Sequence, residues 1–293
     1  MDKVGFIGLG IMGRPMSLNL LNRGVDLYVY DIDKKAEAIL VNAGATAVTL
    51  GEIGSVCDTV ITILPNGEIV KEVLFGKDGV TSTLSVGSLV IDMSSVTPVE
   101  SRYCANKLSA MGIGFLDAPV SGGEPKAIDG TLAIMVGGEK SSFDKAYPYL
   151  MMMGSSATLV GGAGSGSTAK LVNQIVVNGT IAVISEAFVF CVKAGADPTT
   201  VYEAIKDGLA GSTVLDAKLP MITARDFKPG GKISINYKDI SNVLATAHAV
   251  ECPVPFTSSL FEIMQALRVA GQMDDDHAAI VNYFERLADV EVK

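Results

Sequence analysis

"VGFIGLGIMG", residues 4 to 13, joins a short apolar strand to three glycines, Gly8, Gly10 and Gly13, with the spacing G-x-G-x-x-G. In this motif the first glycine permits a tight turn, the second lets the backbone approach a pyrophosphate, and the third lets the next helix pack closely on the strand. The N-terminus of that helix attracts phosphate. The stretch therefore predicts a dinucleotide-binding turn made by Gly8, Leu9, Gly10, Ile11, Met12 and Gly13. A glycine turn without a ligand is the alternative.

The end of the next predicted strand supports a dinucleotide. The strand LYVYD, residues 27 to 31, ends in Asp31, 18 residues after Gly13. An acidic residue at this place accepts hydrogen bonds from the ribose hydroxyls of the adenosine. Because its carboxylate repels a 2'-phosphate, we expect NAD in preference to NADP, while Lys34 and Lys35 close by keep NADP open as an alternative.

The pattern of strands and helices predicts an α/β fold in two domains. Strands expected in the first half are VGFIG (4–8), LYVYD (27–31), TVITIL (59–64), LVIDMS (89–94), GFLDAPV (114–120), TLAIMVGG (131–138) and TLVGG (158–162). Helical patterns separate most of them, which is typical of a mainly parallel sheet covered on both faces. After residue 166 only helical patterns remain, at 167–194, 198–208, after 212, at 236–250 and at 256–271. We expect a Rossmann-type dinucleotide-binding domain at 1–162 followed by an all-α domain at 163–293.

Composition excludes several classes of partner. Apolar residues make up 48% and charged residues 19% of the 293 residues, and the net charge is -9, so clustered positive charge for nucleic acid is missing. The four cysteines are widely separated and no spacing typical of metal ligands occurs, so we expect no metal site. The N-terminal residues do not resemble an export signal, and the apolar stretch 175–190 is too short to cross a membrane, so we expect a cytoplasmic protein.

The stretch "GAGSGSTAKLVNQ", residues 162 to 174, combines small residues with Lys170 and Asn173. The phosphate-binding pattern GxxxxGK[ST] is absent, because its lysine position holds Ser167. Lys170 and Asn173 are three residues apart and so share one face of a helix. A buried amine oriented by an amide can exchange a proton with a substrate oxygen. A catalytic Lys170 and an ordinary lysine near a helix end both remain open on this pattern.

The stretch "DAPVSGGEPKA", residues 117 to 127, follows a predicted strand and so lies at the ligand-binding edge of the sheet. Ser121, Gly122 and Gly123 can direct a hydroxyl and backbone N–H groups toward an anion such as a carboxylate. A plain turn is the alternative.

Taken together, these segments resemble the β-hydroxyacid dehydrogenase family over the entire chain. The matching motifs are GFIGLGIMGRPM, DAPVSGGEPKAIDGTLAIMVGG, GSGSTAKLVNQ and YKDISNVL. The resemblance implies a nicotinamide-dependent oxidoreductase that acts on a small hydroxyacid or semialdehyde. It implies that Lys170 is the general acid, that Asn173 positions it and the substrate, and that Ser121, Gly122 and Gly123 bind the substrate carboxylate. It also implies cofactor contacts by Leu64, Pro65, Ser95 and Lys238, and a homodimer or homotetramer.

Residues 207–218, "DGLAGSTVLDAK", resemble the branch of this family that reduces tartronate semialdehyde to D-glycerate. The branch acting on 3-hydroxyisobutyrate and a non-catalytic dinucleotide-binding sensor are the alternatives. One departure concerns Gln174, because many relatives have a second asparagine there. His248 and His277 are expected to be structural, and the acidic run 274–276 is expected to form a solvated loop.

Overall fold

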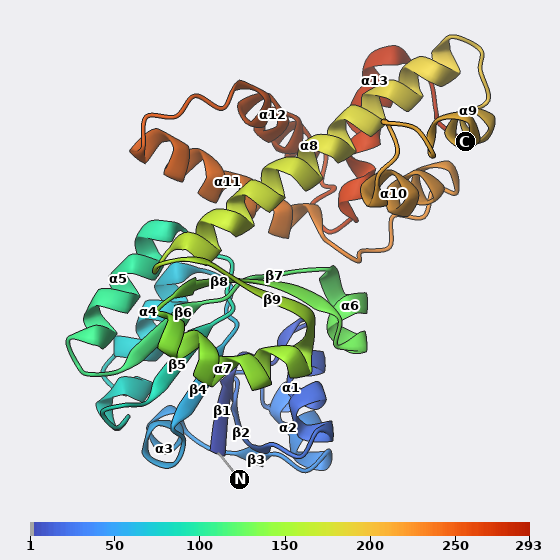
Figure 1. Ribbon diagram of the computed structural model, residues 1–293. Coiled ribbons are helices and arrows are strands. Elements are labelled where there is room, and N and C mark those ends of the chain that lie inside the picture. The colour runs from blue at the N-terminus through green and yellow to red at the C-terminus, as the bar shows by residue number, and fades with distance from the viewer. Residues whose placement is uncertain (1–2) are drawn as a thin grey trace. The chain divides into compact units, whose positions relative to one another are not determined.

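The computed structural model describes residues 3–293, which divide into two compact units (Figure 1). The first, here called the sheet unit, ends at Lys170, and the second, the helical unit, spans Leu171–Lys293. The predicted boundary at 162/163 lies just before the long helix α8, whose first turn belongs to the sheet unit.

The sheet unit is built on a mainly parallel sheet. Its strands are β1 Lys3–Ile7, β2 Asp26–Tyr30, β3 Thr46–Ala47, β4 Thr59–Thr62, β5 Leu89–Asp92, β6 Gly114–Asp117, β7 Val120–Ser121, β8 Leu132–Gly138 and β9 Gly154–Gly161. Their order is β3-β2-β1-β4-β5-β6-β8-β7, with β9 paired to β8. Strands β3 to β6 in this order are parallel, β8 is antiparallel to β6 and β7, and β9 is parallel to β8. The predicted α/β class is confirmed.

Two details of the sheet differ from the prediction. The short strand β3 has only two residues and carries no strand pattern that the sequence would show. The segment expected as one strand at 114–120 is divided into β6 and β7, because Pro119 lies between them and proline has no N–H for a strand ladder.

Helices cover both faces of the sheet. They are α1 Gly13–Asn22, α2 Lys34–Asn42, α3 Leu50–Val56, α4 Gly67–Phe75, the 3-10 helix η1 Val80–Ser82, α5 Pro98–Ser109, α6 Gly123–Asp129 and α7 Lys140–Met153. Successive strand side chains point to opposite faces, so Phe6 packs in the core with α1 and α7, while Ile7 packs in the core with α3, α4 and α5. Because these strands run parallel, the carboxyl ends of β1, β2, β4, β5 and β6 share one edge of the sheet. Ligands bind at this edge in such folds.

The helical unit contains α8 Ser165–Lys193 from Leu171 onward, α9 Pro198–Ile205, α10 Thr213–Thr223, α11 Ile233–Ala249, α12 Pro255–Val269, the 3-10 helix η2 His277–Ile280 and α13 Val281–Ala288. The predicted all-helical second half is confirmed. The sequence pattern missed α13. Two cores form around α8, one with α11 and α12 and one with α10 and α13.

Helix α8 lies within two residues of the helix predicted at 167–194. By length and composition its 29 residues, with a mean hydropathy of 2.1 over 18 of them, could cross a membrane. The expectation that this stretch is too short to do so is therefore wrong. Inside the helical unit, however, Ile181, Ile184 and Phe188 are buried in the two cores. The polar side chains of Asn178 and Ser185 are also buried, and each donates a hydrogen bond to a carbonyl one turn back. These are the contacts of a core helix.

Candidate active site

The three glycines that follow β1 have the geometry that a dinucleotide-binding turn needs. Gly8 has a φ of +98°, and a Cβ there would lie 2.2 Å from the Ile63 carbonyl oxygen. A Cβ at Gly13 would lie 1.9 Å from the Gly8 carbonyl oxygen, so only glycine allows α1 to begin here. Around a Cβ built at Gly10, by contrast, no described atom outside the adjoining residues lies within 4 Å. The backbone at Gly10 is therefore open to a pyrophosphate, and among residues 3–293 no side chain caps the start of α1.

Asp31 is attached to the same turn. Its Oδ2 accepts a hydrogen bond of 2.6 Å from the Leu9 N–H, and its Oδ1 accepts one of 2.7 Å from the Asp33 N–H. These two hydrogen bonds hold the Asp31 carboxylate beside the glycine turn. The residues present therefore fit a dinucleotide whose phosphates lie at the turn and whose ribose meets Asp31.

The predicted contacts Leu64, Pro65 and Ser95 follow β4 and β5 at the same edge. The Leu64 N–H donates to the Ser94 hydroxyl at 2.8 Å, so the two segments are tied together where they leave the sheet. Leu64, Pro65 and Ser95 thus lie just after strands that end at the same edge of the sheet as β1, and their contacts with a cofactor stay a prediction.

Two carboxylates that the sequence did not single out are buried beneath these loops. Asp92 and Asp117 are paired residues at the ends of β5 and β6, and both are about 1% exposed. Burial raises the pKa of Asp92 to about 6, despite hydrogen bonds from Ser94 and Thr62. Burial likewise raises the pKa of Asp117, although the Ser167 and Gly164 N–H groups donate to it. Their position as the last residues of strands was the signal that could have identified them.

Lys170 contacts the serine–glycine turn. Its Nζ donates a hydrogen bond of 2.9 Å to the carbonyl oxygen of Val120, the residue before Ser121 in β7. Gly122 and Gly123 then take φ values of +139° and +68°, which glycine adopts readily. Two segments that are 50 residues apart in sequence therefore meet, and the amine lies next to the turn predicted to bind a carboxylate.

Asn173, the other predicted catalytic residue, lies three residues further along α8 and within the helical unit. Its amide donates to the Gln174 Oε1 at 3.0 Å. Gln174 is 5% exposed, and its Nε2 donates to Asp239 at 2.5 Å. Lys238, a predicted cofactor contact, pairs with the other oxygen of Asp239 at 3.1 Å. Gln174 therefore links Asn173 to the Lys238–Asp239 pair.

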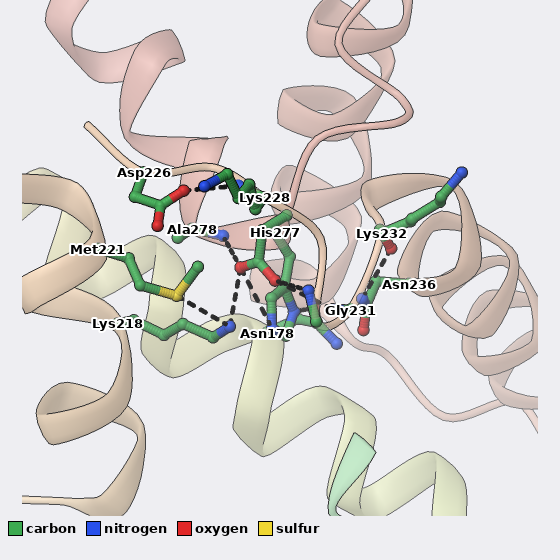
Figure 2. A network of polar contacts seen from close by, with 12 residues as sticks. Asn178, Lys218, Met221, Asp226, Lys228, Gly231, Lys232, Asn236, His277 and Ala278 are labelled. Carbon is green, nitrogen blue, oxygen red and sulfur yellow. Dashed lines mark hydrogen bonds and ion pairs between the residues drawn. The ribbon is translucent and has the colours of Figure 1, made fainter. Parts of the chain in front are cut away.

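The expectation of a solvated acidic run at 274–276 is wrong for Asp276. Its side chain is fully buried and accepts hydrogen bonds from Lys218 Nζ at 2.8 Å and from the N–H groups of Gly230, Gly231 and Ala278 (Figure 2). These contacts fix the glycine loop 230–231 onto η2. The neighbouring His277 is buried, and its Nδ1 lies 3.3 Å from the Asn178 Oδ1, which agrees with the structural role expected for it. Burial lowers its pKa to about 4.

Titratable side chains do not gather into a metal site in the described part of the chain, residues 3–293. Cys57, Cys104 and Cys191 are buried free thiols, and Cys252 is an exposed one.

Comparison with known proteins now identifies the family. Residues 3–162 match the family described as the NAD binding domain of 6-phosphogluconate dehydrogenase, and residues 164–284 match the NAD-binding region of NADP-dependent 3-hydroxyisobutyrate dehydrogenase. The chain is 39% identical to 2-hydroxy-3-oxopropionate reductase of Escherichia coli (strain K12) over 98% of both chains. It belongs to the β-hydroxyacid dehydrogenase family.

Other members of the β-hydroxyacid dehydrogenase family are similar as well. The 2-(hydroxymethyl)glutarate dehydrogenase of Eubacterium barkeri is 36% identical, over 99% of this chain and 97% of that protein. A solved structure of Mycobacterium tuberculosis 3-hydroxyisobutyrate dehydrogenase with L-serine has a TM-score of 0.90 at 30% identity, covering 96% of this chain and 98% of the other. The chain is therefore an oxidoreductase with NAD(P)-binding domains, in a family whose members act on different substrates.

Proposed function

We propose that this β-hydroxyacid dehydrogenase reduces tartronate semialdehyde (2-hydroxy-3-oxopropanoate) to D-glycerate, with Lys170 as the proton donor. The observation that carries the proposal is the hydrogen bond of 2.9 Å from the Lys170 Nζ to the Val120 carbonyl oxygen, directly before the Ser121 turn. This arrangement suits a substrate with a carboxylate at one end and an aldehyde within reach of an amine. The 39% identity to 2-hydroxy-3-oxopropionate reductase supports the choice of substrate.

The protein's part in the reaction is binding, orientation and proton transfer. Ser121, Gly122 and Gly123 hold the carboxylate through a hydroxyl and backbone N–H groups, and Asn173 helps to orient the substrate. The glycine turn and Asp31 would hold the dinucleotide, which when bound would supply the hydride that the aldehyde carbon needs. Lys170, as an ammonium ion, donates a proton to the aldehyde oxygen and becomes a neutral amine, so the new C–H and O–H bonds complete the alcohol. The positive charge also stabilises the negative charge that develops on that oxygen.

We further propose a preference for NAD over NADP. The Asp31 carboxylate is held in place by the N–H groups of Leu9 and Asp33, so it cannot easily move away from a 2'-phosphate. Lys34 offers little compensation, because its amine donates to the Asp31 carbonyl oxygen and pairs with Glu37 at 2.7 Å. A 2'-phosphate would thus meet a fixed negative charge next to a lysine that already has a partner.

Reduction of methylmalonate semialdehyde to 3-hydroxyisobutyrate is the second candidate function. It is favoured by the family match of residues 164–284 and by the TM-score of 0.90 to the Mycobacterium tuberculosis enzyme. Tartronate semialdehyde carries a hydroxyl group where methylmalonate semialdehyde carries a methyl group. A binding site built to hydrogen-bond a hydroxyl strongly rejects the analogue that lacks it.

A steady-state panel tests these proposals together. Tartronate semialdehyde and methylmalonate semialdehyde are each assayed with NADH and with NADPH, and kcat/KM is compared across the four combinations. We expect the highest kcat/KM for tartronate semialdehyde with NADH. A higher value for methylmalonate semialdehyde would replace the first function by the second. NADH binding without turnover of any hydroxyacid in a wider panel would support a non-catalytic sensor.

We also propose that the chain forms a homodimer or homotetramer. Val176, Val183 and Phe190 lie seven residues apart on one face of α8 and are 59%, 66% and 72% exposed. An apolar stripe of this kind is typical of a surface covered by another subunit. Light scattering after gel filtration measures the mass, and the Val183→Lys variant is expected to shift it toward the monomer.

A further inference from the structure

Asp117 connects two segments that lie far apart in the sequence. As the last residue of β6, it is about 1% exposed, and both of its carboxylate oxygens accept backbone hydrogen bonds. Oδ1 accepts from the Gly164 N–H at 2.8 Å, and Oδ2 accepts from the Ser167 N–H at 2.7 Å. These two donors belong to the entry and the first turn of α8, which otherwise lack intrahelical acceptors. A buried carboxylate of the sheet thus holds the start of the helix.

Other contacts confine the same turn. The Ser101 and Ser167 hydroxyls lie 2.8 Å apart and are both buried. A Cβ at Gly166 would lie 2.2 Å from the Asp117 carbonyl oxygen, so the helix backbone rests directly on the end of β6. The first turn of α8 is therefore packed closely against the end of β6.

Lys170 lies one turn further along α8. The rigid helix transmits the position of the first turn to this residue, whose Nζ bonds to the Val120 carbonyl 2.9 Å away. Val120 is only three residues after Asp117. The short segment 117–120 therefore contacts α8 at two places, through the Asp117 carboxylate at the first turn and through the Val120 carbonyl at the lysine.

We propose that Asp117 is a positioning residue: by holding the Gly164 and Ser167 N–H groups, with the Ser101 hydroxyl in support, it fixes the first turn of α8 and so keeps the Lys170 amine beside the Ser121 turn. The catalytic consequence rests on the proposed role of Lys170 as proton donor. A misplacement of about 1 Å in a reacting group can lower a rate roughly 10²-fold.

Asp92 provides a matched control, because it is equally buried and pairs with Asp117 across the sheet. At position 117, both oxygens face backbone N–H groups, so the NH₂ of an asparagine would meet another donor. At position 92, the Thr62 hydroxyl and the Ser94 N–H both donate to Oδ1, which an asparagine retains as its amide oxygen. The remaining Ser94 hydroxyl can accept as well as donate. Both substitutions remove a buried carboxylate, but only one breaks the attachment of α8.

The experiment compares Asp117→Asn with Asp92→Asn in the full-length protein. Tartronate semialdehyde reduction with NADH gives kcat and the KM for NADH, and amide hydrogen exchange followed by mass spectrometry gives the protection of residues 164–170. For Asp117→Asn we expect kcat to fall about 10²-fold, an unchanged KM for NADH and faster exchange in 164–170. For Asp92→Asn we expect wild-type exchange in 164–170 and at most a small change in kcat.

Wild-type protection of 164–170 in Asp117→Asn would overturn the proposal, and so would an equal loss of kcat and protection in both variants. If Asp117→Asn does not fold, Ser101→Ala decides, because it removes only the supporting hydroxyl: faster exchange in 164–170 with a several-fold lower kcat is expected, and wild-type behaviour would contradict the proposal. The exchange measurement does not depend on the chemistry of Lys170. An active Lys170→Ala variant would therefore reject the proposed function without altering the result for Asp117.

Discussion

Asp117 of the sheet unit and Asp276 of the helical unit are both buried carboxylates that accept backbone N–H groups. Asp276 also pairs with the Lys218 ammonium, whereas Asp117 has no ion pair among residues 3–293. Burial raises the pKa of both carboxyls, and at Asp117 the hydrogen bonds from Ser167 and Gly164 do not reverse this effect. At Asp276 the Lys218 ammonium and the Ala278 N–H do reverse it, and the pKa lies below its usual value. A neighbouring cation together with N–H donors favours the charged form of buried Asp276, whereas N–H donors alone do not offset burial at Asp117.

The neighbours of these carboxylates extend the contrast. Asp92, beside Asp117, has a pKa raised by burial to about 6, whereas His277, beside Asp276, has a pKa lowered by burial to about 4. The sheet unit therefore favours a protonated group in its interior, and the helical unit favours an unprotonated imidazole. The regions around Asp92 and His277 should therefore respond to acid in opposite directions.

The largest expected effect is on the Asp276 cluster of the helical unit. Replacing Asp276 by alanine leaves the Lys218 ammonium and three backbone N–H groups without their acceptor, so we expect a loss of roughly 3–5 kcal/mol in the free energy of unfolding. Urea unfolding measures this loss. Asp274→Ala is the matched control, because Asp274 also pairs with a lysine but its side chain is 88% exposed. Equal, small losses in the two variants would show that the buried cluster contributes no more than a surface ion pair.

A second prediction concerns pH. Asp92 has a folded pKa above its usual value, so its protonated form is favoured by folding: this stabilisation is present below about pH 4 and is lost as the pH rises to about 6. His277 has a folded pKa below its usual value, so its stabilisation is present above about pH 6.5 and is lost as the pH falls to about 4. Each shift corresponds to about 3 kcal/mol at most.

Hydrogen exchange at pH 5 and pH 7, corrected for the intrinsic rate, measures the two units separately. Going to pH 5, we expect protection to fall around η2 and the Asn178 turn of α8 and to be maintained or to rise at β4, β5 and β6. Asp92→Asn should abolish the rise in the sheet unit, and His277→Gln should reduce the fall in the helical unit. Parallel changes in both units would contradict the opposite signs assigned to the two groups.

A smaller effect is expected at Gln174. Gln174→Met keeps the length of the side chain but removes the hydrogen bonds to Asn173 and Asp239, so Asn173 loses its orientation. Because such bonds contribute about 1 kcal/mol each, we expect kcat to fall about tenfold. Thr180→Val removes a hydrogen bond on the same helix, that to the Val176 carbonyl, and serves as the control. A kcat in Gln174→Met equal to that of the control would remove Gln174 from the catalytic network.

Much of the fold was predictable because its signals are local. The glycine spacing, the Asp31 strand end and the apolar strands all act over a few residues, and the α/β class followed from them. The contacts of Asp117 with Gly164 and Ser167 span 47 and 50 residues, so no local pattern in the sequence predicts them. The prediction of a solvated loop at 274–276 was wrong for the same reason. Asp276 is buried by Lys218 and by the 230–231 loop, which are remote in sequence. Gln174 was noticed only as a departure, and its partner Asp239 is 65 residues away.

Proton donation from the Lys170 ammonium to the substrate is tested by the Lys170→Ala variant. Turnover of tartronate semialdehyde with NADH is measured with and without added methylamine, and NADH binding is measured by fluorescence. Lys193→Ala, at the other end of α8, is the control, because that amine also donates to a carbonyl oxygen, of Ala288. We predict unchanged NADH binding, a loss of about 10²-fold or more in kcat, and partial recovery with methylamine in Lys170→Ala alone. Near-normal turnover in Lys170→Ala would contradict the account.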